Sequence, residues 1–200
     1  MRPTVSSCSA FVLVLGIAVL LAGCGRGQGP PEVAALIADL TSGDEQKSGE
    51  ARLALISLGE VATPALVELL QGGQPQERIV AATTLWGMGA RAPSAVPALA
   101  AGLSDPDPEL RVACAMALEN TGPAAREAVP ALVEALDDPD RPVRQAAVKA
   151  LGAIGPAAGS ALPALDRAIR RESWPEAEEA VLRIRGGEDG ALDDLAEGRN

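Results

Sequence analysis

The chain has 200 residues, of which 48% are hydrophobic and 22% charged, and its formal net charge at pH 7 is −10. This length and composition suffice for one globular unit with a sizeable core, and because only 2% of the residues are aromatic, that core must be aliphatic. The negative charge would repel a phosphate backbone, and two tryptophans are a poor platform for stacking bases. The composition therefore argues against nucleic-acid binding.

The N-terminus has the features of an export signal. Arg2 supplies a positive charge, and an uncharged apolar run of thirteen residues, Ala10 to Ala22, follows it. A helix that crosses a bilayer needs roughly 20 apolar residues. A shorter run of this kind is typical of the hydrophobic region of a cleaved signal peptide.

The end of this run, Leu21-Ala22-Gly23-Cys24, resembles the lipobox of bacterial lipoproteins. The resemblance implies a lipoprotein signal peptide over residues 1–23, cleavage before Cys24, and lipid attachment at Cys24 that anchors the protein to the membrane. It also implies a location in the bacterial cell envelope on the periplasmic side, with the inner and outer membranes both open. An ordinary cleaved signal with an incidental cysteine is the alternative. Residues 24–30 are rich in Gly and Pro and predict a tether.

The rest of the chain offers few groups for catalysis. It contains no histidine, so Ser-His pairs, Cys-His pairs and imidazole metal sites are excluded. Cys114 lies in the apolar stretch "RVACAMAL" and has no disulfide partner once Cys24 is lipidated, so we interpret it as a small buried core residue. No Gly-rich phosphate loop occurs in a strand–helix context. We therefore expect no enzyme, no cofactor and no metal site.

From residue 31 the chain repeats itself every 33 residues. The interval separates the prolines of "TPALVELL", "VPALAAGL", "VPALVEAL" and "LPALDRAI", which are Pro64, Pro97, Pro130 and Pro163. It also separates the glycines Gly89, Gly122 and Gly155. Pro31 extends the proline series, with a loop between its two helices about three residues longer and a next connection about three residues shorter. Five units therefore span residues 31–185.

Each unit has the signals of two helices. The repeated proline suits the first turn of the first helix, where its missing N–H has no intrahelical role. "DPDPELR" and "DPDRPVR" place an Asp N-cap at the entry of the second helix. "TGPAA" and "IGPAA" end that helix with Gly and then Pro. Because no segment alternates with period two, strands are not expected, and the predicted fold is all-α.

The segment 128–155, "AVPALVEALDDPDRPVRQAAVKALGAIG", and its close copy over 95–122 resemble the HEAT-repeat family, especially the HEAT-like repeats of phycobilin lyases. The resemblance implies an α-α superhelix, a HEAT-like solenoid of about five stacked helical hairpins. The resemblance also implies one possible activity, that of a bilin-lyase-like HEAT-repeat enzyme. That activity needs a chromophore pocket, and the export signal places the chain in the wrong compartment for it.

The resemblance also implies a structural ladder of hydrogen bonds between an Asp in the inter-helix turn and an Arg six residues later. The pattern carries over to Asp105 with Arg111 and to Asp138 with Arg144. It fails in the second unit, where Gly72 stands in the place of the Asp that would face Arg78, and in the last, where Arg171 and Ala177 replace both residues. We interpret the Arg series as structural.

A helical wheel separates two faces of the second helices. In the fourth unit Ala147, Val148 and Leu151 line the core face, and their equivalents 33 residues apart are all apolar. The opposite stripe should face the concave surface of the solenoid, where the resemblance places the second helices. We predict that this stripe binds a protein or peptide through Ile79, Thr83, Trp86, Val112, Met116, Glu119, Gln145 and Lys149.

Four members of this stripe break the rule that an exposed face is polar. Ile79, Trp86, Val112 and Met116 are apolar, and an exposed apolar patch with Trp and Met is typical of a partner site. The alternatives are burial by neighbouring helices, cover by the tether or tail, and membrane contact. Trp174 is expected to close the C-terminal end of the solenoid, and residues 186–200 are expected to form an acidic flexible tail.

Together these patterns predict a non-enzymatic, lipid-anchored HEAT-repeat scaffold or adaptor, monomeric, that binds a protein or peptide partner through its concave face at the bacterial envelope. A structural envelope spacer without a specific partner is the first alternative. The bilin-lyase-like enzyme is the second.

Overall fold

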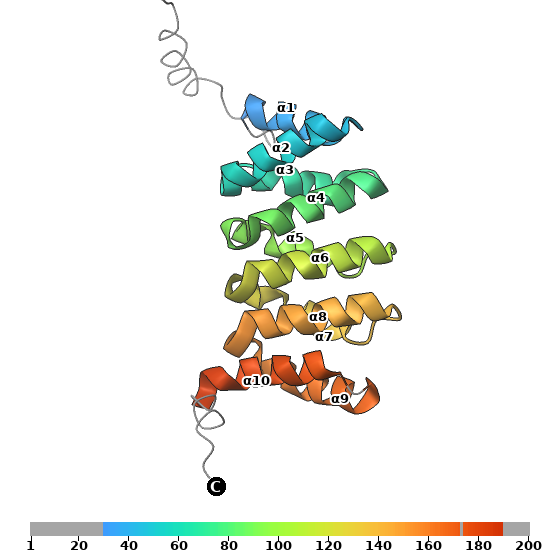
Figure 1. Cartoon of the computed structure of the whole chain (residues 1–200), viewed down its shortest axis with the longest axis vertical. Helices are drawn as coiled ribbons and strands as arrows, with labels where there is room; N and C mark the ends of the chain where they lie inside the picture. Colours follow the sequence, from blue (N-terminus) through green and yellow to red (C-terminus); the bar gives the residue numbers. More distant parts are fainter. Residues whose placement is uncertain (1–29, 173, 190–200) are drawn as a thin grey trace, which may run out of the picture.

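The computed structural model describes residues 30–172 and 174–189, and its regular structure there is entirely helical. Five helical hairpins stack in one column, so the predicted all-α solenoid is confirmed (Figure 1). The predicted signal peptide over residues 1–23, Cys24 with nearly all of the tether, and residues 190–200 of the predicted tail lie outside the described residues.

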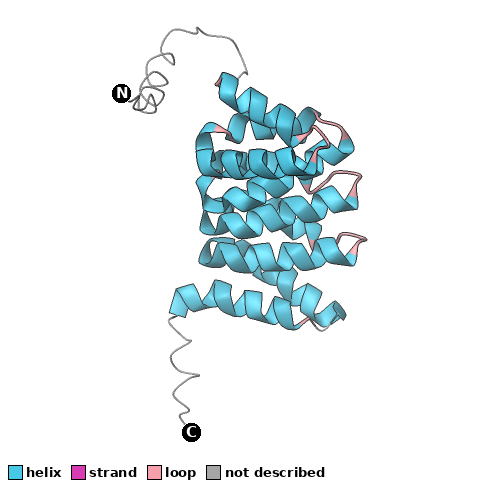
Figure 2. Ribbon diagram, turned by 45° about the horizontal axis from the view of Figure 1, so that its top comes forward, coloured by secondary structure: helices cyan, strands magenta, loops and turns pink. Residues whose placement is uncertain are grey.

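Each hairpin pairs an odd-numbered helix with an even-numbered one, and short 3-10 segments or turns connect the hairpins (Figure 2). The odd-numbered helices are α1 (Pro31–Leu40), α3 (Thr63–Gly72), α5 (Val96–Gly102), α7 (Val129–Ala135) and α9 (Leu162–Glu172). The even-numbered helices are α2 (Glu45–Leu58), α4 (Pro75–Met88), α6 (Pro108–Thr121), α8 (Arg141–Ile154) and α10 (Pro175–Asp189). The even-numbered helices lie side by side on one face of the column (Figure 1).

The ends of the helices follow the sequence signals. The carboxylate of Asp107 accepts a hydrogen bond from the backbone N–H of Glu109 at 2.9 Å and caps the start of α6. Four even-numbered helices end at a glycine with φ between 53° and 69°, a conformation that costs little only for glycine. These glycines are Gly59, Gly89, Gly122 and Gly155.

The core consists of small and branched aliphatic side chains from both the odd-numbered and the even-numbered helices. Ala147, Val148 and Leu151 of α8 are fully buried, as predicted. Their equivalents in α4, α6 and α10 are at most 7% exposed. The core face read from the helical wheel is therefore confirmed in these four helices.

The first hairpin departs from this pattern. Counted back from the terminal glycine, Arg52 in α2 occupies the position of Ala82 in α4 and Ala115 in α6. Arg52 is only partly buried, whereas both alanines are fully buried. The N-terminal hairpin therefore has a weaker apolar seal against its neighbour than the other units have.

The C-terminal hairpin differs from expectation in two details. α10 continues to Asp189, beyond the boundary expected at Arg185, because a Gly pair weakens a helix without ending it when no proline follows. Trp174 is 3% exposed, and the guanidinium of Arg144 lies over its ring at 5.6 Å from the centroid. The ring therefore packs between the fourth and fifth units rather than only covering the outer end.

One helical stretch in the described residues, Arg141–Arg171, is long and apolar enough to cross a membrane by length and composition alone. It comprises α8, the 3-10 segment Gly155–Ala161 and α9, and 56% of its most apolar window is buried inside the column. Its apolar character is therefore that of a solenoid core.

Cys114 is fully buried in α6, and an added Cβ on Gly102 would lie 2.4 Å from its Sγ atom. Burial raises the pKa of this thiol to about 12, with a smaller contribution in the same direction from Asp105. At pH 8 only about one thiol in ten thousand would then be the reactive thiolate.

We expect a fragment of residues 30–200, which has no other cysteine, to resist labelling by a disulfide reagent while folded and to react fully in guanidinium chloride. Rapid stoichiometric labelling of the native fragment would contradict the burial of Cys114.

Candidate functional site

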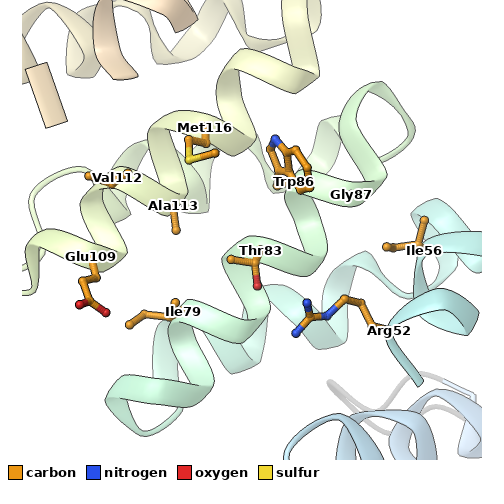
Figure 3. Close-up of a pocket in the computed structure, with 10 residues that line it drawn as sticks. All are labelled: Arg52, Ile56, Ile79, Thr83, Trp86, Gly87, Glu109, Val112, Ala113 and Met116. Atoms are coloured by element: carbon orange, nitrogen blue, oxygen red, sulfur yellow. The ribbon is translucent and has the colours of Figure 1, made fainter. Parts of the chain in front are cut away.

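The even-numbered face carries a groove of about 420 Å³ that spans α2, α4 and α6 (Figure 3). Its volume is within the range of pockets that hold small ligands or anchoring side chains. Its surface is almost entirely apolar, with one cation and one carboxylate among the residues that line it. The lining residues are Arg52, Ile56, Ile79, Thr83, Trp86, Gly87, Glu109, Val112, Ala113 and Met116.

The groove brings together five members of the stripe predicted to bind a partner: Ile79, Thr83, Trp86, Val112 and Met116. The three other predicted residues lie outside it. Glu119 and Lys149 line a separate, largely polar hollow of about 190 Å³ where α6, α8 and α10 meet. Gln145 is partly buried in α8 and lines neither hollow. The stripe is therefore two surfaces of different chemistry, apolar toward the N-terminus and charged toward the C-terminus.

The apolar members of the stripe differ in exposure. Trp86 is 46% exposed and Met116 is 41% exposed, which is high for such large apolar side chains. Ile79 and Val112 are partly buried and pack against the core. Contact between neighbouring helices thus accounts for much of the burial of Ile79 and Val112, but it leaves a large part of Trp86 and Met116 at the surface.

The wheel missed the part of the groove that comes from α2. It was extended in steps of 33 residues, whereas α2 is displaced by three residues relative to that repeat. Alignment on the terminal glycines would have found it, because Ile56 precedes Gly59 by three residues as Trp86 precedes Gly89. The same alignment assigns Arg52 to a core position, and Figure 3 shows its guanidinium extending from α2 toward Thr83.

Two contacts fix the positions of the helices that form the groove. An added Cβ on Gly87 would lie 2.5 Å from Cδ1 of Ile56, so the absence of a side chain lets α2 approach α4 here. The side-chain amide of Asn120 in α6 donates a hydrogen bond of 2.6 Å to the backbone carbonyl of Trp86. The end of α4 that presents Trp86 is therefore held from both sides.

The Asp–Arg ladder lies at the turns between the two helices of each hairpin, and its side-chain pairs join neighbouring units. Arg111 donates from Nε and Nη2 to the carboxylate of Asp138 at 2.8 and 3.0 Å, and also bonds Asp140. Within its own unit Arg111 reaches the backbone carbonyl of Asp105 at 2.8 Å. The expected pairing of each Asp with the Arg six residues later is therefore wrong for the carboxylates, because the long guanidinium side chain reaches the turn of the next unit.

The same geometry corrects the expectation for the second unit. Arg78 pairs with Asp105 of the following unit, so the Gly72 in its own turn does not remove it from the ladder. Arg144 donates to the backbone carbonyls of Asp138 and Pro139, both at 2.9 Å, and lies over the Trp174 ring. In the last unit an aromatic ring thus lies against the arginine of the preceding unit.

Arg111 is 8% exposed, yet its pKa is raised above the ordinary arginine value. The hydrogen bonding that Arg111 donates to the carboxylate of Asp138 is the largest cause and outweighs the opposing effect of burial, and Asp140 adds to it. A permanently charged guanidinium in bidentate contact with a carboxylate is a strong, geometrically specific pair. In the part of the chain that the structure describes, no cluster of three or more His, Cys, Asp or Glu side chains is placed to hold a metal ion.

Comparison with known proteins agrees with this architecture. The family model described as HEAT repeats matches residues 63–126 and 96–184. No curated protein sequence matches the chain. The chain is similar in structure to the complex of CpcE and CpcF of phycocyanin lyase from Nostoc sp. PCC7120, with a TM-score of 0.61, 21% identity, and coverage of 76% of this chain and 97% of that one.

Designed repeat proteins are similar as well. One is a designed armadillo repeat protein in complex with the peptide (KR)4, with a TM-score of 0.58, 19% identity, and coverage of 83% of this chain and 91% of that one. Another is a computationally designed armadillo repeat protein for modular peptide recognition, with a TM-score of 0.54, 17% identity, and coverage of 84% and 93%. At these identities the likeness shows the fold.

The ladder makes a prediction for stability. Arg111→Met should lower the free energy of unfolding by about 3 kcal/mol, because the carboxylate of Asp138 would stay in the interior without its cationic partner. Arg183→Met is the matched control, since the Arg183–Glu179 pair is 58% and 61% exposed, and it should change stability by less than about 0.5 kcal/mol. Urea unfolding followed by circular dichroism measures both. Equal effects of the two substitutions would show that the ladder does not stabilise the column.

Proposed function

Because the chain belongs to the HEAT-repeat family, we propose that it is a lipid-anchored scaffold or adaptor that holds a protein or peptide partner on its even-numbered face at the bacterial envelope. The observation that carries this proposal is the apolar groove with Trp86 and Met116 at its surface. Trp and Met are residues that protein interfaces favour, and a centrally placed Trp is a typical binding hot spot.

The solved structures support a partner of this kind. A designed armadillo protein of similar fold is seen with a bound peptide, and CpcE is seen in complex with CpcF. In a solenoid, side-by-side helices present one extended surface, on which several shallow contacts can add up along a partner. The groove over α2, α4 and α6 would provide the apolar anchor, and the charged hollow at Glu119 and Lys149 would provide a polar rim.

The anchor is part of the same proposal and rests on the sequence. The apolar run Ala10 to Ala22 and the lipobox-like stretch that ends at Cys24 favour a lipoprotein. The short tether would hold the first hairpin near the membrane, and the groove includes α2 of that hairpin. Confinement to a membrane raises the effective concentration of a partner that is attached to the same membrane.

Two other functions make different demands. An envelope spacer would need no exposed Trp86, and its surface could be made polar without consequence. A bilin-lyase-like activity has the fold likeness to the phycocyanin lyase complex in its favour, and it predicts a lasting change in the absorption spectrum when the chain, an open-chain tetrapyrrole and an acceptor protein are combined. The scaffold proposal predicts no such change.

The partner test uses two substitutions in the groove. Trp86→Gln and Met116→Gln should each weaken capture of the partner at least about tenfold, because interface hot spots contribute about 2 kcal/mol or more. Each should cost no more than about 1.5 kcal/mol of stability, since much of either side chain is already in water. Crosslinking and pull-down of the membrane-anchored protein from its own bacterium, followed by mass spectrometry, measures capture.

Leu182→Gln is the matched control for these variants. Leu182 occupies the position of Met116 in the last hairpin and is 49% exposed, but it does not line the groove. It should leave capture unchanged. If capture is the same in all variants, the groove does not hold the partner; a large loss of stability in the Trp86 variant would instead show that its ring is a packing residue.

The anchor test concerns Cys24. The native protein should partition into the detergent phase of membrane extracts, and the mass of its N-terminal peptide should exceed that of the unmodified peptide by the attached acyl groups. Cys24→Ala should abolish both the mass increase and the membrane attachment. A Cys24→Ala protein that stays in the membrane fraction would refute the lipid anchor.

A further inference from the structure

The groove contains a cation at a position that the repeat reserves for the core. Arg52 stands seven residues before the terminal glycine of α2, where the next three units have Ala82, Ala115 and Val148. Those three side chains are fully buried. An arginine is energetically unfavourable at such a position, because its charge is partly removed from water. Its size also hinders close packing of α2 against α4.

No partner within the described residues compensates this cost. The Nε atom of Arg52 is buried and makes no hydrogen bond, and no carboxylate of the described chain lies within ion-pair distance of the guanidinium. Arg111 shows how such a group is satisfied in the same protein: its Nε and Nη2 atoms together bind the two oxygens of Asp138. The guanidinium of Arg52 lines the groove without a carboxylate of the described residues opposite it.

The surroundings of Arg52 define the rest of the ligand. Ile56 of the same helix, with Ile79 and Trp86 of α4, gives the groove an apolar surface beside the guanidinium. Glu109 is the only carboxylate among the lining residues and projects from α6, on the side away from α2 (Figure 3). A carboxylate is therefore attracted to the α2 side of the groove and repelled from the α6 side, and aliphatic groups fit the surface between them.

From this arrangement we propose that the groove binds a segment of a partner protein in which an Asp or Glu side chain is flanked by aliphatic residues. The carboxylate pairs with Arg52, and the aliphatic side chains cover the surface formed by Ile79, Trp86 and Met116. This inference rests on the proposed function and specifies the chemistry of the partner. Because the whole chain carries a net charge of −10, recognition of an acidic segment depends on this local pairing rather than on long-range attraction.

The test is an array of octapeptides with both ends capped, so that no terminal carboxylate is present. Each peptide consists of Leu, Ile, Val and Ala with one variable central residue: Asp, Glu, Asn, Gln or Lys. Full-length protein in detergent should bind Asp and Glu peptides at least about tenfold tighter than their Asn and Gln counterparts, since a hydrogen bond to a charged group contributes about 1.5 kcal/mol or more. Equal binding of acids and amides would overturn the proposal.

Substitutions at Arg52 separate binding from folding. Arg52→Leu restores the apolar character of the other units, so it should keep or raise the melting temperature while the preference for acidic peptides disappears. Arg52→Lys should retain part of the preference, because the charge remains but the two-pronged contact is lost. Arg126→Leu is the control: it removes an exposed cation that does not line the groove, so it should preserve the preference. A melting temperature that falls sharply in Arg52→Leu, or an acid preference that survives it, would show that Arg52 is structural.

The possible failures can be told apart. If Trp86→Gln abolishes capture of the partner but acids and amides bind equally, the proposed function stands and the role of Arg52 is wrong. If neither capture nor peptide binding depends on the groove, both are wrong. The chain's own segment 190–200 contains "ALDDLAEGRN", which is also acidic and aliphatic. A chain that ends at Asp189 and binds the acidic peptides at least tenfold tighter would identify that segment, rather than a partner, as the occupant.

Discussion

The structure depends on close contact between successive even-numbered helices, and that contact requires small side chains. Ala81 and Ala82 in α4, and Cys114 and Ala115 in α6, are fully buried. Larger residues at these positions would push the helices apart, because side-chain size sets interaxial distance. No hairpin of this size can bury its apolar face alone, so the column is stable only as a stack. The outer stripe of each helix is left free to vary, and that freedom is what a binding surface needs.

The arginine ladder makes the packing of one hairpin on the next geometrically specific. Aliphatic contacts between alanine-rich helices tolerate small shifts, whereas a bidentate contact such as that of Arg111 with Asp138 accepts one geometry. Because each arginine reaches the turn of the following unit, the ladder fixes how one hairpin is placed on the next. Toward the C-terminus, Arg144 lies over the Trp174 ring of the following unit. Toward the N-terminus, the residue of α2 that corresponds to Arg78 of α4, counted from the terminal glycines, is Ser48. The first hairpin therefore joins the column without an arginine–aspartate pair of this kind.

Repeat spacing predicted the architecture well, since prolines and glycines at constant intervals reflect local rules for starting and ending helices. The core face followed from periodicity for the same reason. The pairing of the ladder did not follow, because an interval along the chain does not say whether Arg111 turns toward its own unit or the next. The groove was predicted in part: Trp86 and Met116 were recognised as apolar residues on a polar stripe. Arg52 and Ile56 were missed, since three residues in one loop move α2 out of the 33-residue count.

That small displacement connects the fold with the site. The longer loop of the first hairpin, with α2 beginning at Glu45, shifts the residues that α2 presents to α4. Gly87 permits close approach at Ile56, while Arg52, nearer the middle of α2, prevents a sealed interface. At this place the regular packing between hairpins gives way to a groove with an apolar surface, one cation and one carboxylate. The irregular hairpin is also the first of the column, so under the proposed function the departure from the repeat lies on the side of the lipid anchor.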